Sequence, residues 1–278
     1  MKKVWFVTGA SSGIGAGVVR AALEAGDRVI ATARNLEKLR SAIGQPASDR
    51  LAFVSLDVTS EEQAKKAVDA AVEKSGRIDV LVNNAGYSLL GNLESLTQEQ
   101  IERQFQTNFY GVLYMLRAAL PVMRRQRSGH IINVSSMAGV IGYATASAYA
   151  ATKFAVEGLS LSVAQEVKPF GIKVTVVEPG FIRTDLLAPQ SVVFGDLAVE
   201  GYASPAAIKA QWQSYDRQQT GDPAKLGRAL VRLAAMESPP KQFFAGSDAA
   251  EGITADLQAR LAEVQVHKSL SATIDGDF

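Results

Sequence analysis

Short apolar runs alternate with segments of helical composition along almost the whole chain. The apolar runs predict strands near Val4–Thr8, Arg28–Ala33, Leu51–Ser55, Asp79–Val82, His130–Val134, Lys173–Val177 and Gln242–Ala245. The segments between them predict helices near Ile14–Ala25, Leu36–Ile43, Glu61–Lys74, Glu99–Arg125, Tyr149–Val167 and Pro223–Met236. Strands separated by helices indicate right-handed crossovers and a parallel sheet, so we expect an α/β fold with helices on both faces of the sheet.

Two segments depart from this alternation. Leu186–Thr220 is irregular and carries Trp212 and three other aromatic residues among polar ones. A long irregular segment beside a binding site is often a lid, and the alternative is a variable surface insertion. Ile253–Val266 has an amphipathic pattern, and we expect it to dock the C-terminal tail, about residues 247–278, against the rest of the chain.

Composition narrows the range of partners. The 278 residues are 47% apolar, carry a net charge of +1 and include no cysteine. We expect a single domain over residues 1–278, because α/β folds of this size usually close around one core. The charge gives no reason to expect nucleic acid or a membrane surface as a partner. The absence of cysteine excludes disulfides, catalytic thiols and thiolate metal sites.

Signals for metal binding and for targeting are missing as well. His130 and His267 are far apart and have no metal-ligand spacing; His130 fits the end of a strand. The chain enters its first strand within three residues, and no apolar run reaches membrane-spanning length. We therefore expect a cytoplasmic protein without a metal.

A glycine-rich segment connects the first strand to the first helix. It reads Thr8-Gly9-Ala10-Ser11-Ser12-Gly13-Ile14-Gly15. Backbone N–H groups and the positive end of a helix dipole make such a connection suitable for a phosphate. The glycine spacing differs from the general G-x-G-x-x-G pattern, and a loop of this kind can also be only a tight turn.

Ser136, Tyr149 and Lys153 form the most informative constellation. Tyr149 and Lys153 are four residues apart and share one face of the predicted helix. A tyrosine with a pKa of about 10 is a poor acid or base near neutrality. An ammonium about 4 Å away is worth roughly 4 kcal/mol at an effective dielectric near 20, and would lower the phenol pKa into a useful range. Ser136 can hydrogen-bond a substrate oxygen while Tyr149 exchanges a proton with it.

Further motifs follow in order: Asp57-Val58, Asn83-Asn84-Ala85-Gly86, Asn108-Phe109-Tyr110-Gly111 and Pro179-Gly180-Phe181-Ile182-Arg183-Thr184. Together with Thr8–Gly15, Ser136 and Tyr149-x-x-x-Lys153, they resemble the short-chain dehydrogenase/reductase family from Lys3 to about Gly246. The residues within and around these motifs are most similar to those of bacterial oxidoreductases akin to hydroxysteroid and retinol dehydrogenases. The resemblance implies a doubly wound Rossmann fold with strand order 3-2-1-4-5-6 and a seventh strand at the edge, with ligands beyond the carboxyl ends of the strands.

The resemblance also implies roles for single residues. The catalytic residues would be Asn108, Ser136, Tyr149 and Lys153, with Tyr149 as general acid and base and Asn108 holding a water near Lys153. The cofactor would bind Gly9, Ser11, Ser12, Gly13, Ile14, Gly15, Arg34, Asp57, Val58, Asn84, Ala85, Gly86, Tyr149, Lys153, Pro179, Gly180, Ile182 and Thr184. The substrate would contact Ser136, Tyr149, Met137, Tyr143 and Phe181.

The end of the second strand predicts the choice of cofactor. Arg34 follows Ala33, where relatives that use NAD would hold an aspartate. An arginine pairs with the 2′-phosphate of NADP, so we expect NADP(H) to be preferred over NAD(H). Ser12 stands where the family has a second basic residue, which predicts a moderate preference.

These features predict hydride transfer between nicotinamide C4 and a hydrophobic ketone, aldehyde or secondary alcohol. Two alternatives are an NADP(H)-sensing regulatory protein and an epimerase or dehydratase on the same fold. Filled catalytic positions disfavour the first, and the loop spacing disfavours the second.

The helices Glu99–Arg125 and Tyr149–Val167 predict an assembly. They carry more apolar residues than one face of each helix needs to cover the sheet: Phe105, Phe109, Leu113, Leu116, Leu120, Val156, Leu159 and Val163. In similar proteins the surplus forms a four-helix interface around a two-fold axis. A homodimer is expected, a homotetramer would need a second interface, and the alternative is one broad face covered by the chain itself.

Overall fold

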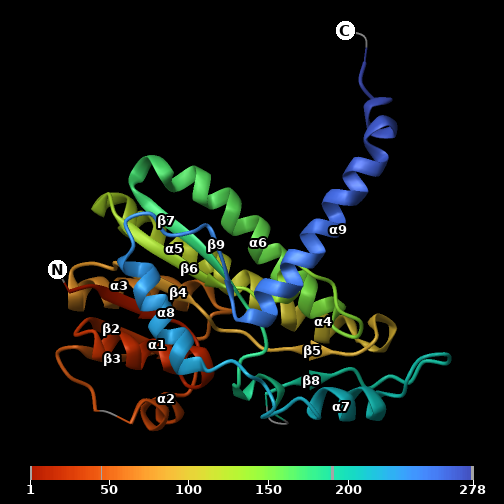
Figure 1. Ribbon diagram of the computed structural model, residues 1–278. Coiled ribbons are helices and arrows are strands. Elements are labelled where there is room, and N and C mark those ends of the chain that lie inside the picture. The colour runs from red at the N-terminus through yellow and green to blue at the C-terminus, as the bar shows by residue number, and fades with distance from the viewer. Residues whose placement is uncertain (1, 45, 189–190, 277–278) are drawn as a thin grey trace.

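The computed structural model of the protein describes residues 2–44, 46–188 and 191–276. Their centre is a seven-stranded sheet in the order β3-β2-β1-β4-β6-β7-β9, with every neighbouring pair parallel (Figure 1). The strands are β1 (Val4–Val7), β2 (Arg28–Ala33), β3 (Leu51–Ser55), β4 (Val80–Asn83), β6 (Gly129–Val134), β7 (Ile172–Pro179) and β9 (Gln242–Ala245). The predicted parallel sheet and its strand order are confirmed.

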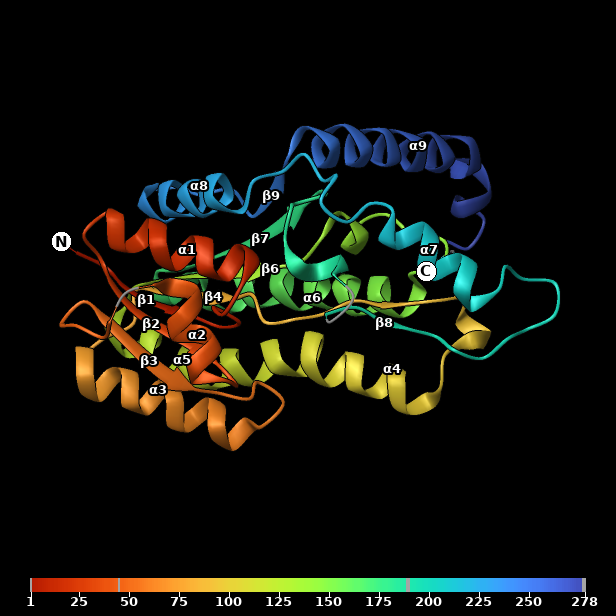
Figure 2. The ribbon, with the colours of Figure 1, turned by 90° about the horizontal axis from the view of Figure 1, so that it is seen from below.

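Helices cover both faces of this sheet (Figure 2). One face carries α1 (Gly13–Glu24), α2 (Leu36–Ile43) and α8 (Pro223–Ala235); the other carries α3 (Glu61–Ser75), α5 (Gly111–Gln126) and α6 (Ser147–Val167). Alternate side chains of a strand point to opposite faces. In β1, Val4 and Phe6 join one apolar cluster while Trp5 and Val7 join the other, so both faces are buried as the continuous apolar runs predict.

Two glycines allow α1 and α8 to touch at their backbones. A Cβ on Gly17 would lie 2.4 Å from Pro223 O, and one on Gly227 would lie 2.4 Å from Gly17 O. A side chain at either position would therefore force the helices apart. This close contact holds α8 beside the helix that begins at the glycine-rich loop.

The predicted helix Glu99–Arg125 is divided into three consecutive elements. α4 (Gln98–Phe105) and α5 are joined by a π-helical turn at Gln106–Tyr110. Within that turn the Asn108 side chain donates to Tyr87 O at 3.0 Å and accepts from Tyr87 N at 3.1 Å. The prediction of helical structure over Glu99–Arg125 is confirmed, with a π-helical turn at Asn108. Because Tyr87 lies in a different segment, helical composition alone could not reveal the partner of this asparagine.

The segment Leu186–Thr220 is less irregular than predicted. It contains β8 (Val193–Phe194), which pairs in parallel with β5 (Leu89–Leu90), and α7 (Pro205–Gln213). Trp212 on α7 donates its indole N–H to Thr145 Oγ1 at 2.8 Å. The segment is thereby fastened to the turn that precedes α6.

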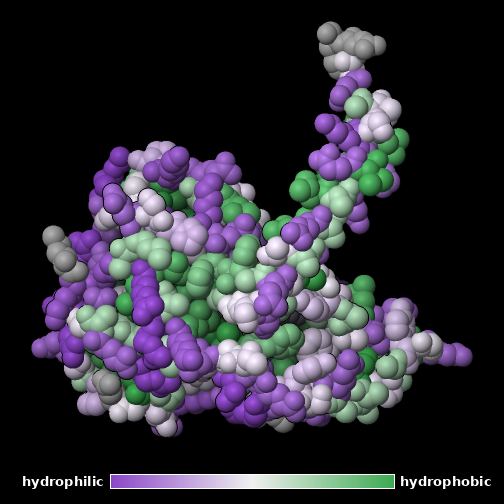
Figure 3. All heavy atoms as spheres, viewed as in Figure 1, coloured by the Kyte–Doolittle hydropathy of each residue, from purple (hydrophilic) through white to green (hydrophobic). Residues whose placement is uncertain are grey.

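The C-terminal helix α9 (Ser247–Ala272) docks only by its first turns. Ala249 and Ile253 are buried, whereas the rest projects from the body and displays apolar side chains (Figures 1 and 3). Leu261 and Leu270 are 61% and 67% exposed. Arg260 still reaches the body, where its side chain donates to Val140 O, so the prediction that Ile253–Val266 docks the tail was wrong only beyond Arg260. An amphipathic pattern shows that a helix has an apolar side, and says nothing of the surface available to it.

No described helix, α9 included, combines the length and the apolar character needed to cross a membrane.

Candidate active site

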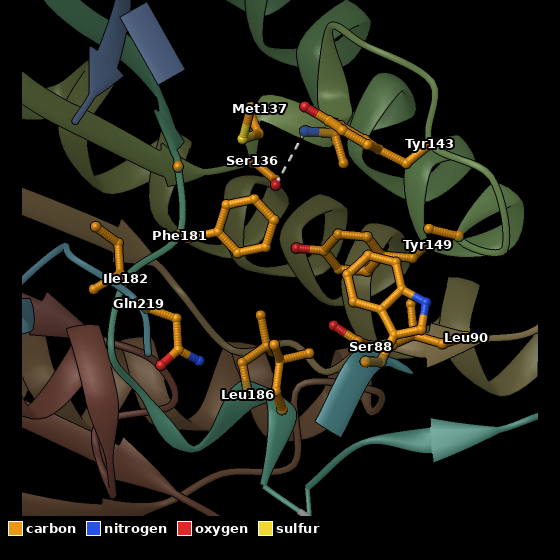
Figure 4. Close-up of a pocket in the computed structure, with 15 residues that line it drawn as sticks. Ser88, Leu90, Ser136, Met137, Tyr143, Tyr149, Phe181, Ile182, Leu186 and Gln219 are labelled. Atoms are coloured by element: carbon orange, nitrogen blue, oxygen red, sulfur yellow. Dashed lines mark hydrogen bonds between the residues drawn. The ribbon is translucent and has the colours of Figure 1, made fainter. Parts of the chain in front are cut away.

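Two cavities meet beyond the carboxyl ends of the central strands. An open groove extends along the glycine-rich loop, and a smaller cavity lies next to it. Ser136, Tyr149 and Ile182 line both, so the two cavities open into each other at these residues. The hydroxyl groups of Ser136 and Tyr149 point into the same part of the smaller cavity (Figure 4).

Glycines and one asparagine shape the loop between β1 and α1. Gly9 and Gly13 have φ angles of +64° and +52°, a backbone conformation that glycine adopts at little cost. Asn84, directly after β4, donates from Nδ2 to Thr8 O at 3.0 Å and to Gly9 O at 3.1 Å. A Cβ on Gly15 would lie 2.4 Å from Gly9 O, so this glycine is packed inside the loop. The N-terminus of α1 is thus presented to the groove, an arrangement suited to phosphate.

The groove brings together nearly all the residues predicted to bind a cofactor. They follow β1, β2, β3, β4 and β7 or lie on α6. Because parallel strands end at one edge of a sheet, distant segments meet there. The predicted residues that line it are Gly9, Ser11, Ser12, Gly13, Ile14, Arg34, Asp57, Val58, Asn84, Ala85, Gly86, Tyr149, Lys153, Pro179, Gly180, Ile182 and Thr184. Gly15 does not.

Besides Lys153, three basic side chains line the groove, and sequence reasoning missed two of these three. Arg34 is exposed at the end of β2, and Lys38 lies one turn into the following helix. Arg103 arrives from α4. Among the described residues, none of the three is part of an ion pair. The helical spacing from Arg34 could have indicated Lys38, whereas no local signal pointed to Arg103.

Ser136 and Tyr149 are placed by the ends of two regular elements. Ser136 follows β6, where its Oγ accepts from Ala138 N at 3.1 Å. Tyr149 lies in the first turn of α6, and its hydroxyl points into the same part of the cavity as the Ser136 hydroxyl. Burial raises the pKa of Tyr149, and the nearby Ser136 side chain offsets this only in part. Tyr149 is therefore protonated at neutral pH.

Lys153 is buried one turn further along α6. Its Nζ donates to Val134 O at 2.9 Å and lies 5.7 Å from the centre of the Tyr149 ring. Burial lowers the pKa of Lys153 to about 8. We expected Lys153 to depress the pKa of Tyr149, but in this structure that pKa is raised. The reason is that burial acts on the phenol while the ammonium is directed to a main-chain carbonyl.

Asn108 stands behind the groove. It is 1% exposed, and its Nδ2 also lies 3.3 Å from Thr152 Oγ1, the residue before Lys153 on α6. Its hydrogen bonds therefore join the π turn, the segment after β4 and α6. Asn108 is thus close to Lys153 along α6 without lining the groove.

The smaller cavity is mostly apolar. All five residues predicted to contact substrate line it: Ser136, Tyr149, Met137, Tyr143 and Phe181. The remaining lining residues are Ser88, Leu90, Ala138, Ala146, Gly180, Ile182, Leu186, Leu187, Trp212 and Gln219. None of these side chains is charged, so a charged ligand would be buried without a counter-ion, which is costly. The segment 186–220 contributes four of the residues, which places it on the wall of the cavity.

The described residues contain no group of three or more potential metal ligands. His130 lies in β6, where its Nε2 is 2.9 Å from Thr175 Oγ1, and burial lowers its pKa to about 4. It is a neutral core residue distant from both cavities.

Comparisons with known proteins place this geometry in context. A family model described as short chain dehydrogenase matches residues 3–192. The chain is 40% identical over 251 residues to the oxidoreductase BOA17 of Botryotinia fuckeliana. The aligned region covers 90% of this chain and 91% of that protein.

Solved structures agree. A short-chain dehydrogenase from Streptomyces avermitilis has a TM-score of 0.89 and 38% identity, covering 99% of each chain. The structure of ElxO with NADP bound has a TM-score of 0.72 and 30% identity, covering 88% of this chain and 97% of that one. A Burkholderia phymatum structure in complex with NAD, with a TM-score of 0.81 and 23% identity, covers 96% and 95% and shares the fold.

Proposed function

Because the chain belongs to the short-chain dehydrogenase/reductase family of oxidoreductases, we propose that it transfers a hydride between NADP and an uncharged, hydrophobic carbonyl compound or secondary alcohol. One observation carries the proposal: the hydroxyl groups of Ser136 and Tyr149 converge where the groove meets the apolar cavity. A carbonyl oxygen placed there can receive a hydrogen bond from one hydroxyl and a proton from the other.

Each residue then has a defined task in reduction. Tyr149, protonated at neutral pH because its pKa is raised, donates its proton to the carbonyl oxygen. Ser136 holds the same oxygen by a hydrogen bond. The Lys153 ammonium lies 5.7 Å from the centre of the Tyr149 ring, and the N–H donors that do not bind Val134 O are available to the cofactor ribose. Asn108 positions α6, and a water beside it would connect Lys153 to solvent. In oxidation the proton moves the other way.

The groove fits a dinucleotide phosphate. When bound, the nicotinamide supplies or accepts the hydride. The N-terminus of α1 would hold the pyrophosphate, and Thr184 with the Ile182 backbone would hold the carboxamide. Arg34, with Lys38 and Arg103 in the same groove, is suited to a 2′-phosphate, which favours NADP(H) over NAD(H).

Changing Arg34 to Ala together with Ala33 to Asp is expected to move the cofactor preference toward NAD. Charge-assisted hydrogen bonds contribute roughly 1.5–3 kcal/mol, so the ratio of the kcat/KM values for NADPH and NADH should fall by about ten- to a hundredfold. Arg28→Ala, at the exposed opposite end of β2, is the matched control and should leave the ratio unchanged. An unaltered ratio in the double variant would show that the 2′-phosphate is held elsewhere.

A panel of ketones, aldehydes and alcohols tests the reaction class itself. Turnover, followed through the absorbance of reduced nicotinamide, is expected for uncharged hydrophobic ketones with NADPH. Carboxylate-bearing analogues should be poor substrates because the cavity offers no cation. NADPH binding without turnover across the panel would favour the alternative of a cofactor-sensing protein.

The proposal extends to the organisation of the chain. Residues 1–278 would form one domain, with residues 186–220 as a lid and the protein located in the cytoplasm. The contact of Trp212 with Thr145 and its place on the cavity wall support the lid. Cell fractionation tests the location.

A homodimer is expected through α4, α5 and α6. Phe105, Phe109, Leu113, Leu120 and Leu159 stay half-buried in the single chain, and Phe154 is 40% exposed. Light scattering should give twice the single-chain mass of 29.6 kDa, and Phe154→Glu should reduce it. Leu261→Glu, on the projecting part of α9, is the control. A mass near 29.6 kDa for the unaltered protein would contradict the prediction.

A further inference from the structure

Two glutamates are buried together next to the proposed active site. Glu157 on α6 and Glu178 on β7 are 6% and 0% exposed, and their carboxyl groups approach the same side-chain nitrogen. Gln242 on β9 lies against both, with its Nε2 3.4 Å from Glu157 Oε2 and 3.1 Å from Glu178 Oε1. Phe243 N donates to Glu178 Oε2 at 3.0 Å. The proposed reaction assigns no role to either glutamate.

The donors named so far are too few to satisfy all four carboxylate oxygens of the pair. Among the described residues, the buried Glu157 Oε1 has no partner within hydrogen-bonding geometry. The Ser135 hydroxyl lies against Glu157, but its single proton also faces Lys153 O at 3.4 Å. Two ionised carboxylates buried side by side would repel each other. A proton held between them removes the repulsion and supplies the missing donor.

The surroundings decide which carboxyl keeps the proton. Glu157 lies one turn from Lys153 on the same helix, and the lysine ammonium favours its ionised form. Glu178 has only the neutral donors Gln242 and Phe243 beside it, together with Glu157 itself. Burial raises the pKa of both groups, and that of Glu178 reaches about 9. The proton therefore resides on Glu178 and the negative charge on Glu157.

We propose that Glu157 and Glu178 share one proton at neutral pH, and that the single negative charge left on Glu157 keeps Lys153 in its ammonium form. Glu157 is then a positioning residue that acts through Lys153. Glu178 limits the charge of the pair to one. The part that concerns Lys153 rests on the proposed function, because that function uses the charge of Lys153. The shared proton does not depend on the proposed function.

Among the groups named here that face the glutamate pair, Lys153 is the charged one. α6 contributes Lys153, which is the charged neighbour, and the residue after β6 is Ser135, whose hydroxyl is neutral. β9 contributes Gln242 and Phe243, neither of which titrates. Burial lowers the pKa of Lys153 to about 8, and the charge on Glu157 opposes that change. Since an ammonium loses its charge as the pH rises through its pKa, removal of the Glu157 charge extends the neutral form of Lys153 to lower pH.

Infrared spectroscopy of the cofactor-free protein tests the shared proton without any assay of activity. Glutamate side chains normally titrate near pH 4.3, so a carboxylic acid C=O band at pH 7 reports an abnormal carboxyl. With ¹³C-labelled glutamate, the unaltered protein should show this band, and Glu178→Gln should lose it. Its absence from the unaltered protein at pH 7 would overturn the proposal, and so would its persistence in Glu178→Gln.

The Lys153 titration in two variants tests the second half. In Glu157→Gln the lysine loses its anionic neighbour, so its midpoint should move to lower pH. In Glu178→Gln, Glu157 keeps its single charge, so the midpoint should stay nearly unchanged. NMR of ¹⁵N-labelled lysine side chains measures both in the cofactor-free protein, and the alkaline limb of kcat/KM should follow. Glu166→Gln, exposed on the same helix, is the control.

A purely structural role would leave the midpoint of Glu157→Gln unchanged, or would shift both variants equally, and either result would overturn the proposal. If the NMR shifts occur but no carbonyl compound is turned over, the proposed function fails and the charge-holding pair stands. Glutamine has nearly the shape of glutamate, and circular dichroism checks that each variant is folded.

Discussion

Replacing Tyr149 with Phe is expected to lower turnover by roughly 10²–10⁴-fold, the usual contribution of general acid catalysis. The ring still packs in the first turn of α6, while the hydroxyl that faces Ser136 is lost. NADPH binding should stay nearly unchanged, because the other residues of the groove remain. Single-turnover kinetics and the quenching of protein fluorescence by NADPH measure the two quantities separately.

Tyr143→Phe provides the matched control for this change. Tyr143 lines the same cavity, but its hydroxyl has no place in the proposed proton transfer. Its removal should alter KM for some substrates and leave kcat within a few-fold. If Tyr149→Phe keeps more than about a tenth of the original turnover, another group supplies the proton and the assignment is wrong.

Replacing Lys153 with Met is expected to reduce both turnover and cofactor affinity, since the ammonium is proposed to serve both. An ammonium whose pKa is lowered to about 8 is neutral above that pH. For the unaltered enzyme, kcat/KM should therefore fall as the pH rises through about 8, and this limb should disappear in Lys153→Met. Lys168→Met, exposed just after α6, is the control. Unchanged cofactor affinity in Lys153→Met would contradict the proposed ribose contact.

Local patterns in the sequence were enough for the sheet and for the region of the site. Each strand of the central sheet is a short apolar run buried on both faces. Burial on both faces requires consecutive apolar residues, and such runs can be recognised directly in the sequence. A chain of alternating strands and helices then has few topologies open to it. Motifs that follow strand ends are thereby brought to one edge of the sheet. Ser136 and Tyr149 could accordingly be named before any geometry was known.

The state of the titratable side chains depends on contacts between distant segments. Lys153 is directed to Val134 O by the packing of α6 against β6, and this contact, together with burial, explains why the pKa of Tyr149 is raised instead of lowered. Glu157 and Glu178 meet only because α6 packs on β7 beside β9. No spacing along the chain records such a meeting.

The same distinction separates what could be predicted of the helices from what could not. A helix whose apolar side covers the sheet finds its packing partner in the sheet itself. The helices α1 and α8 are examples. The π turn at Asn108 exists because Tyr87 offers backbone groups to the asparagine side chain. The course of α9 depends on Asp248, which accepts from Phe181 N at 2.7 Å, and on the lack of an apolar surface beyond Ile253. The sequence by itself determined the parallel sheet and the residues gathered at its edge, because these follow from periodicity and chain connectivity, while the strand order was implied by the resemblance to the family. The tertiary structure alone decided charge states, the π turn and the path of the tail, because these depend on which surfaces meet.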